Sequence, residues 1–346
     1  TFQSLSYTLD VYRGDLKPLS SLLDYAFYDR SFPAGAGPIV RARDFVPQIH
    51  QPLRVTNEMF GQGIFFIVSG LFKKAVISDY ISINFVERIF DNPGLYSGLE
   101  NLFGVYGYAL QIYCDFSGYS DMAIGLALLL GFRFPINFNS PYKSDSVTDF
   151  WHRWHISLST WLRDYLYISM GGNRKGKLRT YINLIVTMLL GGLWHGASWN
   201  FIVWGGLHGA ALAVHKLLRS LLHVQDLSQY GDSAFLCGGD YVPFRLLLLD
   251  FFRNTTFEGS QTMIRQIFTS FHPELFVQLI TGYWKVFALM ALGYVLHWLP
   301  DSWQDACSRG VVRLPLVGQA LLVIVLIFIV IQVKSSDIQP FIYFQF

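Results

Sequence analysis

His195 is the side chain whose surroundings most strongly suggest chemistry. It lies in residues 183–214, an apolar stretch whose only other ionisable side chain is His208, and Gly192 and Gly196 lie close to it. An ionisable group at membrane depth is costly to insert, so it is a candidate functional residue when it faces a cavity or a partner. Glycines let another helix or a substrate approach closely. His195 is therefore the first candidate for catalysis or for a proton path.

A second group of histidines lies in residues 144–170, for which we predict an amphipathic helix or a helix pair. Ser146 can cap its start, and Asp149 follows three residues later, as in a capping box. His152 and His155 would then lie one helical turn apart. This spacing permits three interpretations.

The first interpretation is a metal site, but it needs further ligands from elsewhere, and the sequence has no HExxH motif. The second places both histidines at the level of the lipid headgroups, among the neighbouring tryptophans. The third is catalytic. One of the two histidines would meet His195 across a cavity, where imidazole can carry a proton near neutral pH.

The composition and the long apolar segments indicate that these histidines belong to a membrane protein. Hydrophobic residues make up 52% of the chain and charged residues only 14%, and the mean hydropathy is +0.34. An ordinary soluble domain has roughly a quarter of its residues charged. The segments that reach or approach the roughly 20 residues of a spanning helix are residues 59–72, 101–131, 183–214, 276–299 and 314–333. Residues 183–214 exceed one span, and we predict a break near Gly191, Gly192 and residues 198–200.

Charged residues indicate topology and do not indicate a nucleic-acid partner, because a net charge of +2 comes with no continuous basic stripe. By the positive-inside rule, two basic groups are expected on the cytoplasmic side. They are Lys73 with Lys74, and Arg174 with Lys175, Lys177 and Arg179. Three scattered cysteines, Cys114, Cys237 and Cys307, predict neither a disulfide framework nor a zinc site.

Four sequence blocks, in this order, carry a family resemblance. They are Asp115-Phe116-Ser117-Gly118-Tyr119-Ser120-Asp121, residues 131–138 (GFRFPINF), residues 150–159 (FWHRWHISLS) and residues 192–197 (GLWHGA). Together they resemble the membrane-bound O-acyltransferase family, in particular its bacterial branch that O-acetylates exopolysaccharides, alginate first and cellulose next. Relatives that transfer D-alanyl to teichoic acid are also similar. The resemblance covers nearly the whole chain.

The resemblance implies a fold and a set of site residues. The implied fold is an all-α bundle around a central funnel or tunnel, with re-entrant and amphipathic helices. We expect residues 1–346 to form one such transmembrane domain, with residues 101–219 as its catalytic core and further helices before Thr1. His195 and His155 match the family's two histidines, and the supporting positions are His152, Asp115, Asn137, Arg163 and Trp194.

The resemblance also implies a reaction. The donor would be acetyl-CoA or another acyl thioester, entering near the basic residues 174–179, with no bound cofactor and no metal. His195 would act as general base or hold the acyl group itself, and His155 would orient or polarise the thioester carbonyl. The expected partners are periplasmic acetyltransferase proteins and an exopolysaccharide, reached directly or indirectly, from a multi-pass position in the bacterial inner membrane.

Two other classes remain as alternatives. A transporter or proton channel would use His195, Asp115 and Asp121 as a relay. A membrane haem protein would use His155 and His195 as axial ligands. One stretch departs from the resembled family: residues 225–241 are polar where a spanning helix is expected.

Overall fold

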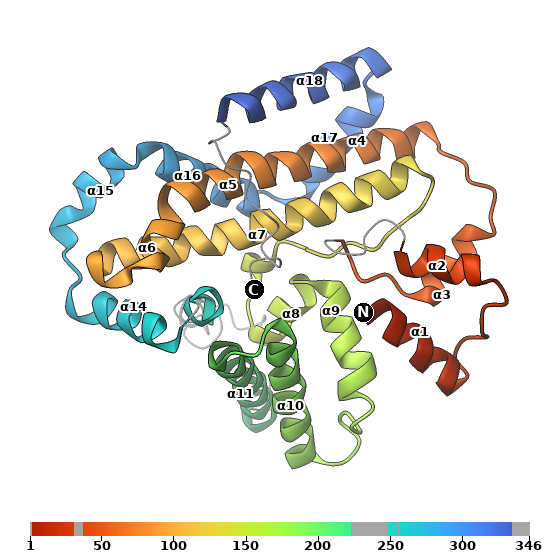
Figure 1. The fold of residues 1–346 in the computed structure, drawn as a ribbon, viewed down its shortest axis with the longest axis horizontal. Coiled ribbons are helices and arrows are strands. Elements are labelled where there is room, and N and C mark those ends of the chain that lie inside the picture. Colours follow the sequence, from red (N-terminus) through yellow and green to blue (C-terminus); the bar gives the residue numbers. More distant parts are fainter. Residues whose placement is uncertain (1, 31–36, 223–247, 255, 334–346) are drawn as a thin grey trace.

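The computed structural model describes residues 2–30, 37–222, 248–254 and 256–333. Within these residues the chain is helical and has no strand, as predicted (Figure 1). The α-helices are α1 (Phe2–Arg13), α2 (Leu22–Arg30), α3 (Ala42–Ile49), α4 (Asn57–Leu71), α5 (Asp79–Ile81), α6 (Glu87–Asp91), α7 (Gly98–Leu129), α8 (Val147–Arg153), α9 (Ile156–Trp161), α10 (Lys177–His195), α11 (Trp199–Leu222), α14 (Phe257–Thr269), α15 (Phe276–Gly282), α16 (Trp284–Trp298), α17 (Asp301–Arg313) and α18 (Leu316–Val333). The π-helical segments are η1 (Phe72–Ser78), η2 (Ser82–Val86) and η5 (Leu162–Tyr167), and the 3-10 turns are η3 (Pro93–Leu95), η4 (Pro141–Lys143) and η7 (Pro273–Leu275).

Helices α4 and α7 lie side by side at the centre of the molecule (Figure 1). Small residues bring their backbones into contact, because a Cβ added at Gly70 would lie 2.5 Å from the carbonyl oxygen of Gly118. Helix α7 begins where Ser97 and Glu100 form a reciprocal capping box. It ends just before Gly131, which adopts φ +88, a left-handed conformation that suits glycine.

Lys73 and Lys74 lie within a helical path and not in a loop. Helix α4 continues through η1, α5, η2 and α6. The ammonium of Lys74 pairs with Asp115 at 2.5 Å and with Asp79 at 2.7 Å, and Lys73 pairs with Asp121 at 2.6 Å. The two lysines therefore belong to a helical segment, and their charges are compensated by carboxylates inside the fold. Their expected place on the cytoplasmic side stays a prediction.

Helices α10 and α11 form a hairpin in which glycines again allow close packing. The break between them falls at residues 196–198, whereas Gly191 and Gly192 lie inside α10. A Cβ at Gly192 would lie 2.2 Å from the carbonyl oxygen of Phe201, so the glycine pair serves helix contact and does not end the helix. The predicted break is thus correct at Ser198, whereas Trp199 and Asn200 begin α11 and the glycine pair lies inside α10.

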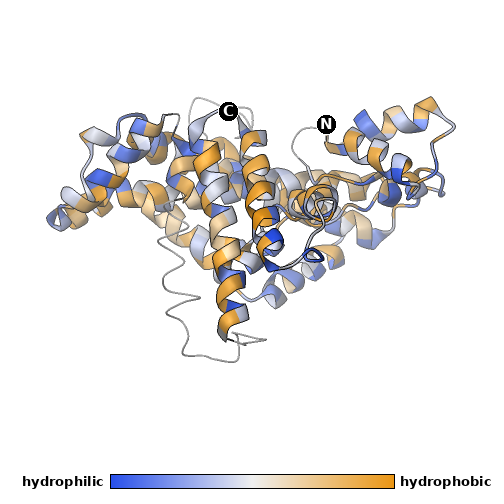
Figure 2. Cartoon of the chain, turned by 90° about the horizontal axis from the view of Figure 1, so that it is seen from below, coloured by the Kyte–Doolittle hydropathy of each residue, from blue (hydrophilic) through white to orange (hydrophobic). Residues whose placement is uncertain are grey.

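Long apolar helices give the molecule a lipid-compatible surface (Figure 2). Among the described residues, Trp199–Leu221 and Leu316–Val333 are long and apolar enough to cross a membrane. The pair Pro273–Gly282 and Trp284–Trp298 makes a third such segment if it is one span, although it bends by 93°. Only 11% of the apolar window in α18 is buried, so its side chains are available to lipid.

Candidate active site

The histidine segment breaks between His152 and His155. Ser146 caps α8, as predicted, but Asp149 pairs with Arg153 at 2.7 Å and does not complete a capping box. Helix α8 ends at Arg153, and His155 adopts φ 43 and ψ 55, in the left-handed region, before α9 begins. The prediction that the two histidines lie one turn apart on a helix is therefore wrong, while the predicted helix pair is correct.

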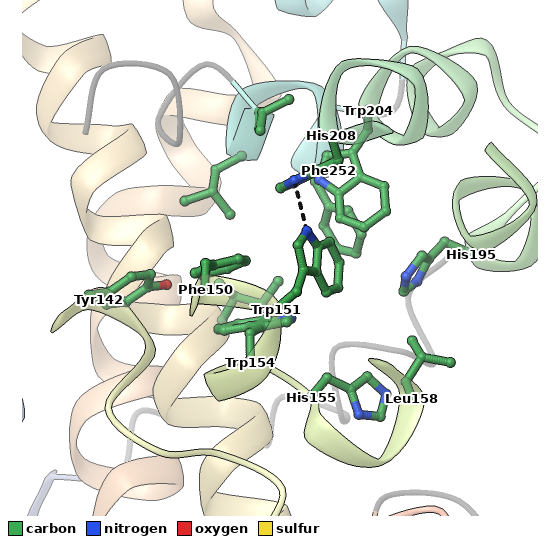
Figure 3. A pocket seen from close by; sticks show the side chains of 13 residues that line it. Tyr142, Phe150, Trp151, Trp154, His155, Leu158, His195, Trp204, His208 and Phe252 are labelled. Carbon is green, nitrogen blue, oxygen red and sulfur yellow. Dashed lines mark hydrogen bonds between the residues drawn. The ribbon is translucent and has the colours of Figure 1, made fainter. Parts of the chain in front are cut away.

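The left-handed turn brings His155 into a small cavity that His195 also lines (Figure 3). We call it the histidine cavity. It is lined by Ile112, Tyr142, Phe150, Trp151, Trp154, His155, Leu158, His195, Trp204, His208, Leu248, Leu249 and Phe252. Its volume is about 40 Å³, and one water needs roughly 10–15 Å³ on this scale. The space suits an acetyl-sized group and is far too small for a porphyrin.

A hydrogen bond to Asn137 fixes the ring of His155. Its side chain is buried, and Nδ1 lies 3.2 Å from Oδ1 of Asn137. The same oxygen accepts hydrogen bonds from the backbone N–H and the hydroxyl of Ser157. Burial lowers the pKa of His155 well below its ordinary value, and the nearby His195 lowers it further. The imidazole is therefore neutral at physiological pH.

His195 is the last residue of α10, and its side chain lines the histidine cavity. Aromatic rings surround its imidazole edge to face: the ring centroids of Trp194, Trp204 and Phe252 lie 4.9, 5.3 and 5.0 Å away. Trp194 in turn packs against Phe2, with 4.9 Å between centroids. These contacts fix the orientation of the ring.

A third histidine, His208, also lines this cavity and was not among the predicted site residues. The indole N–H of Trp151 donates a hydrogen bond to its Nδ1 at 3.2 Å (Figure 3). The sequence spacing could have indicated His208 as a site residue. Trp204, His208, His215 and Arg219 fall on one face of a helix with 3.6 residues per turn.

A second and larger cavity adjoins the histidine cavity, and Trp151 lines both. We call it the basic cavity, and its volume is about 550 Å³. Its basic side chains are His152, Arg163, His215, Lys216 and Arg219. Three of these, on α11, were missed because the predicted apolar stretch ended at residue 214, just before them.

The predicted donor-binding residues are exposed and lie in the loop between η5 and α10 or in the first turn of α10: Arg174, Lys175, Lys177 and Arg179. Lys177 donates to the hydroxyl of Ser220, and Lys216 donates to Asn173. Since Asn173 lines the basic cavity, this loop borders the cavity without supplying those four side chains to its lining.

The remaining predicted residues are placed as follows. Asn137 contacts His155, Trp194 contacts His195, and Arg163 pairs with Asp164 at 2.7 Å beside the basic cavity. Asp115 pairs with Lys74 and is not among the residues that line either cavity. His152 and His155 line different cavities, so a metal shared between them has no geometric support. The polar stretch 225–241 lies outside the described residues.

The chain belongs to the membrane-bound O-acyltransferase family, whose sequence pattern matches residues 5–249. It is 51% identical over 219 residues to a protein of Azotobacter vinelandii named probable alginate O-acetylase AlgI, which covers 63% of this chain and 43% of the relative. A peptidoglycan O-acetyltransferase of Helicobacter pylori is 49% identical over 203 residues, covering 57% of this chain and 38% of the relative. A teichoic acid D-alanyltransferase of Bacillus subtilis is 32% identical over 236 residues, covering 63% and 58%. The chain thus spans less than half the length of the alginate O-acetylases that it matches.

Proposed function

We propose that this chain is the catalytic part of a membrane O-acetyltransferase that moves an acetyl group from acetyl-CoA, or another cytoplasmic thioester, toward an exopolysaccharide. The observation that carries the proposal is that His155, in the turn before α9, and His195, at the end of α10, line one acetyl-sized cavity. Imidazoles serve both proton transfer and acyl transfer near neutral pH. Alginate is the first candidate polymer, because 63% of this chain aligns with several alginate O-acetylases at 50% or 51% identity.

The basic cavity supports a site for the thioester donor. Its volume of about 550 Å³ lies in the range of small-molecule sites. Arg163, Lys216 and Arg219 can pair with phosphates there. Trp151 separates this cavity from the histidine cavity, so a thioester bound among these cations would need only to pass the indole to reach the histidines.

The acceptor side completes the proposal. The polymer would receive the acetyl group outside the inner membrane, directly or through periplasmic acetyltransferase partners, with the funnel of the family linking the two sides. The likeness to a teichoic acid D-alanyltransferase favours D-alanyl transfer to a cell-wall polymer as the second candidate. The proton relay loses support, because Asp115 and Asp121 are already paired with Lys74 and Lys73.

Replacement of His195 tests the function directly. We expect His195→Ala to abolish acetate incorporation into the secreted polymer while the protein still reaches the membrane. His50→Ala is the control, because that histidine is exposed and pairs with Asp24 at 3.2 Å, outside both cavities. Unchanged acetylation in His195→Ala cells would rule out the catalytic assignment.

A further inference from the structure

We infer that Asn137 is a positioning residue that holds His155 in the Nδ1–H tautomer, so that His155 is the proton acceptor of the reaction and cannot polarise the thioester carbonyl by donating to it. The inference rests on the proposed acyl transfer at the histidine cavity. It departs from the expectation drawn from the family resemblance, in which His195 is the base or acyl carrier and His155 polarises the carbonyl.

The first step is the orientation of the Asn137 amide. A backbone N–H can only donate, and the N–H of Ser157 lies 3.2 Å from Oδ1 of Asn137. The Ser157 hydroxyl donates to the same atom at 2.8 Å while it accepts from the backbone N–H of Ile39. On the other side, Nδ2 of Asn137 donates to the hydroxyl of Ser120 at 3.1 Å. The atom that faces His155 is therefore the amide oxygen.

The second step is the tautomer of His155. An amide oxygen only accepts, so Nδ1 of His155, 3.2 Å from it, must carry the proton. A neutral imidazole has one N–H, and burial at 3% exposure keeps this ring neutral. The lone pair of the ring is then on Nε2, the atom turned away from Asn137. The same logic holds for the histidine of a Ser-His-Asp triad, whose tautomer is fixed by the carboxylate that accepts from Nδ1–H.

The third step is the chemistry that this tautomer allows. Nε2 of His155 takes the proton of the acceptor hydroxyl as the hydroxyl oxygen attacks the thioester carbonyl carbon. The C–O bond forms, the C–S bond breaks, and the leaving sulfur takes the proton back from Nε2. The Nδ1–H bond to Asn137 persists throughout and stabilises the transient imidazolium. His195 is then left to contact the acyl group.

Two substitutions at Asn137 separate positioning from bulk structure. Asn137→Asp keeps an acceptor for Nδ1–H and adds a negative charge, whereas Asn137→Leu removes the acceptor at similar size. In membrane vesicles from polymer-secreting cells supplied with acetyl-CoA, we expect Asn137→Leu to lower the saturated rate by about 100-fold, the usual scale of general-base catalysis. The acetyl-CoA concentration for half-saturation should stay unchanged. Asn137→Asp should stay within about tenfold of the parent and shift the acid limb of the pH–rate profile to higher pH.

A second measurement does not depend on acyl transfer. Exchange of the imidazole C2 hydrogen for deuterium, followed by mass spectrometry, titrates His155 in its own peptide. Asn137→Asp should raise the pKa of His155 relative to the parent. The matched control is Asn84→Leu, at a half-buried asparagine of η2 whose amide donates to the backbone carbonyl of Tyr80. It should leave both the rate and the His155 titration close to those of the parent.

Three outcomes overturn the inference. They are a normal rate in Asn137→Leu, an equal loss in Asn137→Asp and Asn137→Leu, and a His155 titration that Asn137→Asp does not move. Each of them leaves the proposed function intact as long as His195→Ala is inactive. Full activity in both His195→Ala and His155→Ala would instead remove the proposed function itself.

Discussion

The indole N–H of Trp151 donates a hydrogen bond to Nδ1 of His208 at 3.2 Å. This bond fixes the indole ring that lines both the histidine cavity and the basic cavity. An indole only donates, so His208 accepts at Nδ1 and carries its own proton on Nε2. The histidine cavity on one side holds about 40 Å³, while the basic cavity on the other holds about 550 Å³. The position of one ring thus limits what fits beside the histidines.

Removing this ring should change the acyl preference. We expect Trp151→Ala to join the two cavities and to raise the rate with butyryl-CoA relative to acetyl-CoA by at least about tenfold, because even one added methylene is worth roughly 1–3 kcal/mol in an apolar pocket. The measurement is the ratio of initial rates with the two thioesters in membrane vesicles. Trp303→Ala, at a tryptophan that is 60% exposed on α17, should leave the ratio unchanged. An unchanged ratio in Trp151→Ala would show that the indole does not set the acyl size.

Two basic groups compete as the donor site, and paired variants distinguish them. We expect Lys216→Ala with Arg219→Ala to raise the KM for acetyl-CoA by about 30-fold, since each cation lost from a phosphate site costs roughly 1 kcal/mol and the two together cost about 2 kcal/mol. Arg174→Ala with Lys175→Ala, at exposed loop positions, should change it less than threefold, a range typical of surface charges. The reverse ordering would place the donor at the loop that the sequence first indicated.

The buried cation Lys74 should matter greatly for stability. Lys74→Met would leave Asp115 and Asp79 without their shared partner. Breaking a buried pair on one side costs about 3–5 kcal/mol. We expect a large drop in the melting temperature of the purified protein in detergent. The control is Lys143→Met, because its partner Asp301 is 65% exposed, and exposed pairs contribute about 1 kcal/mol or less. Equal melting temperatures for the two variants would contradict this account.

Two glycines, one at the contact between α4 and α7 and one in α17, should respond in opposite ways to replacement by alanine. Gly70→Ala would place a methyl group 2.5 Å from a carbonyl oxygen of α7, and such overpacking costs about 1–3 kcal/mol. Gly310 in α17 has nothing within 4 Å of an added Cβ, so Gly310→Ala should stabilise by up to about 1 kcal/mol through helix propensity. Thermal unfolding in one detergent compares them, and a neutral Gly70→Ala would mean that the helices can move apart freely.

His155 should also make stability depend on pH. Its folded pKa lies well below the ordinary value, because of burial first and His195 second. Below about pH 6.5 His155 is therefore protonated in the unfolded chain but not in the folded chain. The free energy of unfolding then falls by up to about 1.4 kcal/mol per pH unit. We expect the melting temperature to fall more steeply between pH 7 and pH 5 in the parent than in His155→Asn. Parallel curves would mean that the imidazole is protonated in the folded state.

The sequence predicted the helical class, the cap at Ser146 and the pairing of His155 with His195 around one cavity. It did not predict the end of α8 at Arg153, because a left-handed residue inside a run of helix-compatible residues leaves no mark in a 3.6-residue periodicity. Tertiary pairing also changed the interpretation of Lys73 and Lys74. Two adjacent lysines look like loop charges until the carboxylates of α7 are known to lie opposite them.

The same left-handed backbone at His155 restricts the evolutionary choices at this position. At φ 43, β-branched and bulky residues are strained, while asparagine is among the few polar side chains that adopt this conformation readily. A descendant of this chain could therefore exchange His155 for asparagine without moving α8 or α9. Such a protein would keep the shape of the site but lose an imidazole, and its other histidine would have to take the proton.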